Sequence, residues 1–279
     1  MVGAGGFVGR AVADRLEAYQ VPQLRVTRSE VDLCERGAGE KLAALLRPGD
    51  AVVAVAARAP CRDVGMMVEN MVIVRSLVVA LRQVQVAHVV NVSSDAVYAD
   101  SSEPLTEGSC ASPSTLHGAM HWARETALRN EVKAPLANLR PSLVYGATDP
   151  HDGYGPNRFR RQARRGEDIV LFGEGEERRD HVYIRDVAEL VCRVLFCCST
   201  GVLNIATGEV YSFRQIADKV VALSGRQLAV KGSRRSGPMP HNGYRPFDIS
   251  ATRAAFPDFR YTPLDEGLCL AQREMEEVH

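Results

Sequence analysis

The sequence predicts an α/β fold in which a doubly wound parallel sheet is followed by a smaller second domain. Short apolar runs rich in β-branched residues alternate with helical patterns through the first half of the chain. This alternation is typical of a parallel sheet covered by helices on both faces. A glycine-rich turn opens the chain directly before the first helical pattern. After about residue 150 the sequence changes to loops rich in Gly, Arg and Pro.

The elements of the expected sheet follow from these patterns. Apolar residues spaced three and four apart predict two helices, one on the stripe Val8, Val12, Leu16 and Tyr19 and one on the stripe Met67, Met71, Val74, Leu77 and Leu81. Strands are expected at 24–27, 51–57, 88–93, 135–140 and 202–208.

Composition and charge exclude several classes of protein. The 279 residues include 34 Lys and Arg balanced by 34 Asp and Glu, whereas nucleic-acid binders normally carry a basic surplus. The seven cysteines are scattered without metal-ligand spacing, as expected for reduced thiols in a cytoplasmic protein. There is neither an apolar stretch of membrane-spanning length nor a signal-peptide pattern. We expect a cytoplasmic protein that binds neither nucleic acid nor membrane.

The opening residues, MVGAGGFVGR, place Gly3, Gly6 and Gly9 three apart before a helix. Glycines let the backbone approach a pyrophosphate, and the helix N-terminus supplies amide donors and a positive dipole. A dinucleotide site also needs a strand feeding into the turn, and only two residues precede Gly3. Either the turn is not a dinucleotide site or the first strand is missing upstream of residue 1. We expect the natural protein to begin several apolar residues earlier.

Two histidines lie one helical turn apart in STLHGAMHWARE, residues 114–125. Their spacing puts His117 and His121 on one helix face. The pair can be two partly exposed surface rings, a metal-binding pair or a catalytic pair. No acidic third ligand lies close in the sequence, so we expect no metal site.

Six segments together resemble one enzyme family. They are the glycine turn, VDLCE (31–35), VAVAA (53–57), NVSSDAVY (91–98), LRPSLVYG (139–146) and GEDIVLFGEGEERRDHVYIRDVAE (166–189). In this order they resemble the extended short-chain dehydrogenase/reductase family, specifically its nucleotide-sugar epimerase/dehydratase branch. The resemblance implies a Rossmann-type domain over 1–149 and a substrate domain over 150–279, with part of 183–208 returning to the first. It also implies a homodimer.

The resemblance implies a set of cofactor contacts. They fall on Gly3, Gly6, Phe7, Val8, Gly9, Asp32, Leu33, Ala56 and Ala57. An NAD-specific site carries an acid at the end of the second strand, where this chain has Thr27 and Arg28. Arg28 can receive a 2′-phosphate. The cofactor is therefore expected to be NADP or NAD, with NADP favoured.

The catalytic residues implied by the resemblance include one intact position and two replaced ones. Ser94 falls on the catalytic Ser/Thr, but His117 and His121 stand where the family has its Tyr-x-x-x-Lys pair. The family's lysine lowers the tyrosine pKa and holds the nicotinamide ribose. Because histidine titrates near neutrality, His117 can act as the general acid/base without such a neighbour, with activity changing between about pH 5.5 and 7.5. His121 can still hydrogen-bond the ribose.

Substrate contacts are implied at Asp95, Asn157, Phe172, Arg179 and Arg245. The two arginines are expected on the diphosphate of a sugar nucleotide, because a planar guanidinium suits an anion. Ala96 stands where the family's 4,6-dehydratases carry their base, so dehydration is disfavoured. Leu143 also replaces an asparagine that many epimerases use on the diphosphate.

Two functions remain open from the sequence. The first is an NAD(P)-dependent epimerase or keto-reductase acting on a nucleotide sugar, with His117 in place of the catalytic tyrosine. The alternative is a catalytically inactive protein that binds nucleotide sugar or dinucleotide in a regulatory or scaffold role.

Overall fold

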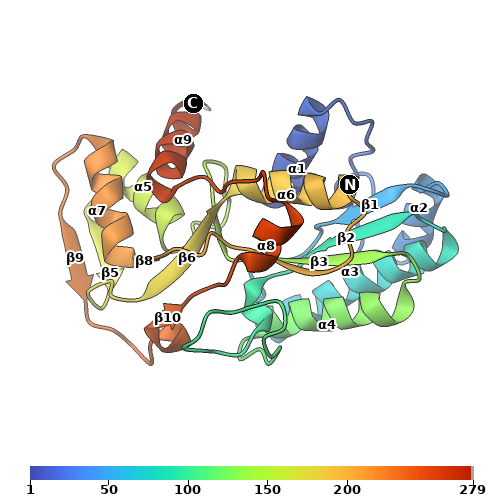
Figure 1. Cartoon of the computed structure of the whole chain (residues 1–279), viewed down its shortest axis with the longest axis horizontal. Coiled ribbons are helices and arrows are strands. Elements are labelled where there is room, and N and C mark those ends of the chain that lie inside the picture. Colours follow the sequence, from blue (N-terminus) through green and yellow to red (C-terminus); the bar gives the residue numbers. More distant parts are fainter. Residues whose placement is uncertain (278–279) are drawn as a thin grey trace. The chain divides into compact units, whose positions relative to one another are not determined.

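The computed structural model describes residues 1–277, which form two compact units (Figure 1). Unit 1 comprises Met1–Ala99, Glu107–Pro141 and Val187–Ile205. Unit 2 comprises Asp100–Thr106, Ser142–Asp186 and the chain from Ala206 onward. Residues 187–205 therefore belong with the N-terminal part of the chain, and residues 100–106 belong with the C-terminal part.

Unit 1 contains a parallel four-stranded sheet in the order β1-β2-β3-β7. The strands are β1 (Ala51–Ala54), β2 (His88–Val92), β3 (Leu136–Pro141) and β7 (Gly201–Ile205). All five residues of β2 are buried, as expected for a strand covered on both faces. Each of these strands lies within one of the predicted runs or one residue beyond it.

Val2 extends this sheet past β1. It forms parallel bridges to Ala54 on one side and to Val26 on the other. The strand expected at 24–27 is wrong as a regular element: Val26 forms a single bridge, because its partner Val2 leads straight into the glycine turn. After Val2 the chain first forms Val26 on one side of Val2, and it then forms β1 on the other side. In such sheets ligands bind at this switch point, beyond the carboxyl ends of the strands.

Helices cover the sheet of unit 1. On one face lie α1 (Phe7–Ala18) and α6 (Ile184–Phe196), and on the other lie α3 (Val64–Gln83) and α4 (Leu116–Glu131) (Figure 1). A shorter helix, α2 (Ala38–Leu45), packs against α3. The predicted stripes are confirmed for their inner positions, since Val12 and Leu16 of α1 are buried and so are Val74, Leu77 and Leu81 of α3.

The length and apolarity of α3 have a packing explanation. With 20 residues and a mean hydropathy of 1.8, α3 is long and apolar enough to cross a membrane. However, Ile73, Val74, Leu77 and Leu81 belong to the hydrophobic core of unit 1, together with Leu42 of α2. A core helix meets the same length and composition criteria.

Unit 2 is built on three parallel strands in the order β10-β6-β4. These are β10 (Tyr244–Arg245), β6 (Arg178–Tyr183) and β4 (Leu143–Tyr145), and β8 (Val210–Ser212) pairs antiparallel with β6. A second pair joins β5 (Ile169–Phe172) to β9 (Val230–Ser233). The remaining helices are α5 (Pro156–Arg165), α7 (Phe213–Ser224), α8 (Ser250–Ala255), α9 (Leu264–Glu277) and the short η2 (Pro240–Gly243).

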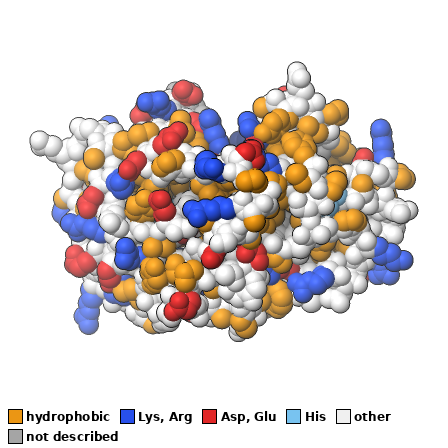
Figure 2. All heavy atoms as spheres, viewed as in Figure 1, with side chains coloured by type: hydrophobic (Ala, Val, Ile, Leu, Met, Phe, Trp, Pro, Cys, Tyr) orange, Lys and Arg blue, Asp and Glu red, His pale blue; other side chains and the backbone are white. Residues whose placement is uncertain are grey.

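Charged side chains of both signs are interspersed over the visible face in Figure 2, with apolar groups between them. This distribution agrees with the equal numbers of basic and acidic residues in the sequence.

Candidate functional site

The glycine turn follows Val2 at the switch point of the sheet. Gly3 has a φ of 91°, and a Cβ there would collide with the backbone of Ala56. A Cβ on Gly9 would collide with the carbonyl oxygen of Gly3. The first turn of α1 can therefore pack this close to the glycine turn only with a glycine at position 9. Gly6 is exposed, and a Cβ there would meet nothing nearer than 3.6 Å. The turn is therefore tight on its inner side and open on its outer side, as a pyrophosphate cradle requires.

Two carboxylates near the end of the second-strand segment are already engaged. Glu30 accepts hydrogen bonds from the amide and the hydroxyl of Thr27. Asp32 accepts one from the Cys34 amide at 3.0 Å and another from Arg28 Nε at 2.8 Å. Those two donors lower the pKa of Asp32. The side chain of Arg28 remains 71 % exposed, whereas Leu33 is buried in the core.

Ser94 and His117 lie on two elements that pack directly on each other. The Ser94 hydroxyl caps η1 (Asp95–Val97) by accepting from the Ala96 amide at 3.2 Å. Gly118 faces the Ala96 carbonyl so closely that no side chain fits between them. This close approach brings the first turn of α4 onto η1. Asp95, one of the expected substrate contacts, is buried beside Ser94.

His117 and His121 form an edge-to-face pair with ring centroids 4.7 Å apart at 88°. The Cys61 amide donates to Nδ1 of the half-buried His117 at 3.4 Å. His121 is 5 % exposed, and its Nδ1 has no hydrogen-bond partner among residues 1–277. Burial lowers the pKa of His121 well below its usual value, with further contributions from His117 and Arg124. The second ring of the pair is therefore neutral.

A buried ion pair fixes α4 against the sheet. Glu125 is fully buried and accepts from Arg140 of β3 through both carboxylate oxygens, at 2.9 and 2.6 Å. The Ser93 hydroxyl also donates to Glu125 at 2.5 Å. This network orients the helix that carries both histidines.

Arg124 is a buried cation that sequence reasoning missed. Its guanidinium donates to the carbonyl oxygens of Ala54 and Ala56 and to Oδ1 of Asn91. In the sequence, Arg124 next to Glu125 has the pattern of a solvated helix face. A better signal was present: Arg124 follows His121 by three positions, which places it on the buried face of α4.

The two arginines expected on a diphosphate are neighbours in unit 2. Parallel pairing of β10 with β6 sets Arg245 opposite Arg179, and their exposed fractions are 1 % and 9 %. Arg245 pairs with Asp100 at 3.2 Å, and Arg179 pairs with Glu177 at 3.3 Å. Nδ1 of His241 lies 3.0 Å from Arg245 Nη1. Sequence reasoning missed Asp100, His241 of the short η2, and Glu177, which lies within the segment 166–189 two positions before Arg179.

The strand that carries Arg179 is held by its neighbour Asp180. This carboxylate accepts from the hydroxyls of Ser142 and Thr207 and from the amides of Thr207 and Gly208, at 2.7–3.1 Å. These contacts tie β6 to the start of β4 and to the turn before β8. The two residues of the Arg-Asp pair thus have different roles. Arg179 lies beside Arg245, and Asp180 is a buried carboxylate that fixes β6.

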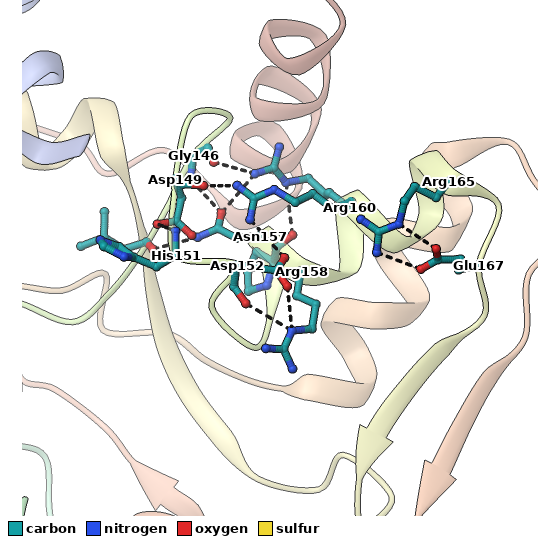
Figure 3. A network of polar contacts seen from close by, with 12 residues as sticks. Gly146, Asp149, His151, Asp152, Asn157, Arg158, Arg160, Arg165 and Glu167 are labelled. Carbon is teal, nitrogen blue, oxygen red and sulfur yellow. Dashed lines mark hydrogen bonds and ion pairs between the residues drawn. The ribbon is translucent and has the colours of Figure 1, made fainter. Parts of the chain in front are cut away.

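The other two expected substrate contacts differ in how accessible their side chains are to a ligand. Asn157 is 5 % exposed, and its amide accepts from the Gly146 amide and from Arg160 at 3.1 Å (Figure 3). Its side chain is thus engaged in holding the loop before α5. Phe172 is 52 % exposed and stacks on Tyr154 with ring centroids 4.5 Å apart. An exposed aromatic face of this kind can take a base.

Metal binding has no candidate site in the described part of the chain. Among residues 1–277, no three His, Cys, Asp or Glu side chains are placed to hold one ion. The pair at 117 and 121 therefore has no third protein ligand in that part of the chain.

Comparison with known proteins assigns the family. Residues 1–206 match the model of the NAD dependent epimerase/dehydratase family, which is well over half of the chain. The chain belongs to this family. A curated relative, the dTDP-4-dehydro-6-deoxy-D-allose reductase of Streptomyces bikiniensis, is 33 % identical over 99 residues, covering 33 % of this chain. The match spans 29 % of the length of that relative.

Solved structures of family members share the whole fold. The UDP-glucose 4-epimerase of Thermus thermophilus, in complex with NAD, superposes with a TM-score of 0.86 at 23 % identity, covering 100 % of this chain and 98 % of the epimerase. The UDP-N-acetylglucosamine 4-epimerase of Methanobrevibacter ruminantium gives a TM-score of 0.82 at 20 % identity, covering 100 % and 97 %. These likenesses confirm the α/β Rossmann-type fold over the full length.

Proposed function

We propose that this protein is an NAD(P)-dependent epimerase or keto-reductase of a nucleotide sugar in which His117 replaces the family's catalytic tyrosine. The observation that carries the proposal is the contact between the Cys61 amide and Nδ1 of His117. Because Nδ1 accepts a hydrogen bond, a neutral ring carries its proton on Nε2. His117 would therefore present an N–H donor beside the Ser94 element.

An N–H donor at this position suits reduction of a keto group. The Nε2 proton of His117 would hydrogen-bond the carbonyl oxygen and stabilise the negative charge that develops there. Transfer of the Nε2 proton to the oxygen would require a protonated ring, in which Nδ1 carries a proton and no longer accepts from the Cys61 amide; the transfer leaves a neutral ring. Ser94 would hold the same oxygen from the other element. The relative from Streptomyces bikiniensis, which is named as a reductase, agrees with this direction.

The glycine turn supports the cofactor part of the proposal. Its close approaches at Gly3 and Gly9 leave the Gly6 side open for the pyrophosphate, and the N-terminus of α1 points amides there. When bound, the dinucleotide would supply the hydride. Ala56 and Ala57 would lie along it, and Arg28, whose side chain is 71 % exposed, would receive the 2′-phosphate of NADP(H).

Arg179 and Arg245 support the substrate class. Two adjacent guanidinium groups in one sheet offer planar donors for a diphosphate. Their present carboxylate partners, Glu177 and Asp100, keep the arginines oriented. Phe172 would stack on the base. We propose a cytoplasmic homodimer, as the resemblance implies, which size-exclusion chromatography with light scattering can check.

One experiment tests the function. The purified protein is mixed with NAD(H) or NADP(H) and a panel of sugar nucleotides, including 4-keto sugars, while nicotinamide absorbance and product sugars are followed. We expect oxidation of the reduced cofactor by a keto substrate. Binding of both ligands without turnover of any sugar would contradict the enzyme proposal.

The second candidate is a binding protein without turnover. It is favoured by the burial of His121, which leaves 5 % of that residue exposed at the position of the family's lysine. A ring so enclosed has little reach toward a ribose. The same panel separates the two candidates, because calorimetry reports binding even where absorbance stays constant.

A further inference from the structure

Arg124 is a buried positive charge without a carboxylate partner. It is 1 % exposed, and all three acceptors of its guanidinium in the described chain are neutral: two carbonyl oxygens and an amide oxygen. A buried cation without a counter-charge costs free energy, so such groups are uncommon in a core built only for packing. Burial lowers the pKa of Arg124 to about 10, which still leaves the group charged near neutral pH.

The guanidinium lies beneath the glycine turn. It donates to Ala54 at 2.9 Å and to Ala56 at 2.5 Å, at the carboxyl end of β1. The backbone of Gly3 runs so close to Ala56 that a Cβ on Gly3 would collide with it. One layer of backbone therefore separates the buried charge from the turn proposed to cradle a pyrophosphate.

The same charge acts on His121. Both residues lie on the buried face of α4. Burial is the main cause that lowers the pKa of His121, and the charges of His117 and Arg124 lower it further. Nδ1 of His121 is buried without a hydrogen-bond partner in residues 1–277.

We propose that Arg124 is a positioning residue of the dinucleotide site: its buried charge lies under the pyrophosphate cradle and beside His121 on the same face of α4. This inference rests on the proposed function only for the identity of the ligand. It explains how a chain with histidine at position 121 keeps a cation in this region.

Few other charges face His121. On its own helix these are His117, Arg124 and Glu125. The elements packed against α4 carry Asp95 on η1, Arg140 on β3 and Glu69, Arg75 and Arg82 on α3. Arg140 is paired with Glu125, Arg82 with Glu131, and Glu69 with Arg58.

The test compares two variants that separate charge from hydrogen bonding. Arg124→Gln removes the charge and keeps an N–H donor. Arg124→Lys keeps the charge and loses the planar guanidinium with its several donors. Histidine resonances are titrated by NMR in protein labelled with ¹⁵N-histidine, with His121→Asn to assign the signal. We expect His121 to stay neutral at pH 5.5 in the wild type and in Arg124→Lys, and to take up a proton at higher pH in Arg124→Gln. An unchanged His121 titration in folded Arg124→Gln overturns the proposal.

A third variant decides the matter if Arg124→Gln does not fold. His117→Phe removes the other neighbouring titratable ring and leaves Arg124 in place. His121 should remain neutral at pH 5.5 in this variant, because burial and the charge of Arg124 both still disfavour a proton on its ring. A normal titration near pH 6.5 would show that His117, and not Arg124, had kept the ring neutral.

Calorimetry with NAD(H) and NADP(H) adds a readout at the ligand. Loss of one nearby charge should weaken dinucleotide binding about tenfold in Arg124→Gln, with a smaller effect in Arg124→Lys. Equal affinity in both variants and the wild type contradicts the part of the proposal that concerns the cradle. If the wild type binds no dinucleotide, the proposed function fails while the titration still judges the role of Arg124.

Discussion

Histidine and tyrosine place different demands on their neighbours when they act on a proton. A tyrosine needs a cation nearby because its hydroxyl otherwise stays protonated at neutral pH. A histidine needs a defined tautomer, which a hydrogen bond to one ring nitrogen supplies. In this chain the Cys61 amide makes that bond to His117, while the cation lies at Arg124, beyond His121.

Replacing His117 tests the proposed donor. His117→Phe keeps a planar ring but removes Nε2, so turnover of a proven substrate should fall at least about 10²-fold, the scale for losing a general acid or an oxyanion donor. Cofactor affinity measured by calorimetry should change little. His151→Phe, at an exposed position in unit 2, is the matched control and should keep full turnover. Full activity of His117→Phe would falsify the assigned role.

Replacing Arg179 tests the diphosphate contact. Arg179→Ala should weaken sugar-nucleotide binding by about 1.5–3 kcal/mol, the scale of a hydrogen bond to a charged group. Arg178→Ala, one position earlier on β6 and exposed, should leave the affinity unchanged. Titration calorimetry with a nucleoside diphosphate measures both. If the two variants lose affinity equally, the contact is not at Arg179.

Replacing Arg28 tests the cofactor choice. Arg28→Ala should weaken binding of NADP(H) about tenfold or more, because a charge-assisted contact to the 2′-phosphate is lost. Binding of NAD(H) should stay the same, since that cofactor has no phosphate there. An equal change for both dinucleotides, measured by fluorescence titration, would remove the preference for NADP(H).

Single residues were predictable where a motif fixed them. The sequence positions of Ser94, His117 and Arg179 follow from the resemblance, and the structure sets Ser94 and His117 on elements that pack together. The partners of the arginines were not predictable in this way. Asp100 meets Arg245 across 145 positions of sequence, and no local pattern encodes a contact of that separation.

At the scale of one element, α4 shows how a helix can carry both the site and its support. Its first turn carries His117 and packs on η1 at Gly118, and its middle carries Arg124 and Glu125 into the core. In the sequence, Glu125 and Arg129 have the spacing of a surface ion pair. The structure keeps this pair at 3.8 Å, but the two shorter contacts of the Glu125 carboxylate, at 2.9 and 2.6 Å, come from Arg140 of β3, because this face of the helix is buried.

Removing Glu125 should therefore destabilise unit 1 strongly. Glu125→Ala leaves Arg140 buried without its counter-charge, and the free energy of unfolding should fall by about 3–5 kcal/mol. Glu131→Ala, at the exposed end of the same helix and paired with Arg82, should cost less than about 1 kcal/mol. Urea unfolding followed by circular dichroism measures both. Similar losses of unfolding free energy would show that the buried pair stabilises the protein no more than the exposed pair does.

Strand length was the least predictable property of the elements. The apolar run 51–57 predicts seven strand residues, and β1 ends at Ala54. The reason is a change of partner: beyond Ala54 the amides of Val55 and Ala56 both donate to the Val2 carbonyl rather than to β2. Apolar character continues past the point where the ladder stops, since Ala56 still packs against the core.

At the scale of the whole molecule, two neutral histidines link stability to pH. Burial lowers the pKa of His181 in unit 2 to about 3 and keeps His121 in unit 1 neutral as well. In the unfolded chain both rings titrate near pH 6.5. Below that pH the unfolded chain binds more protons than the folded one, so stability falls as the pH falls.

Unfolding at two pH values checks this expectation. The wild type should lose free energy of unfolding between pH 7.5 and pH 5, and His181→Asn should lose less over the same interval. Asparagine can keep the donor that His181 directs to the Arg179 carbonyl while removing the titrating ring. Parallel pH dependence in the two proteins would contradict the assignment to His181.

The order in which the two units use the chain bears on how the protein is made. Unit 1 takes β7 and most of α6 from residues 187–205, which leave the ribosome after the segments Asp100–Thr106 and Ser142–Asp186 of unit 2. The sheet that carries the glycine turn thus lacks its β7 edge until more than 200 residues have been synthesised. Until then β3 has an open edge, a site of aggregation in other proteins. The nascent protein therefore spends most of its synthesis with the β3 edge of this sheet unpaired or not yet made.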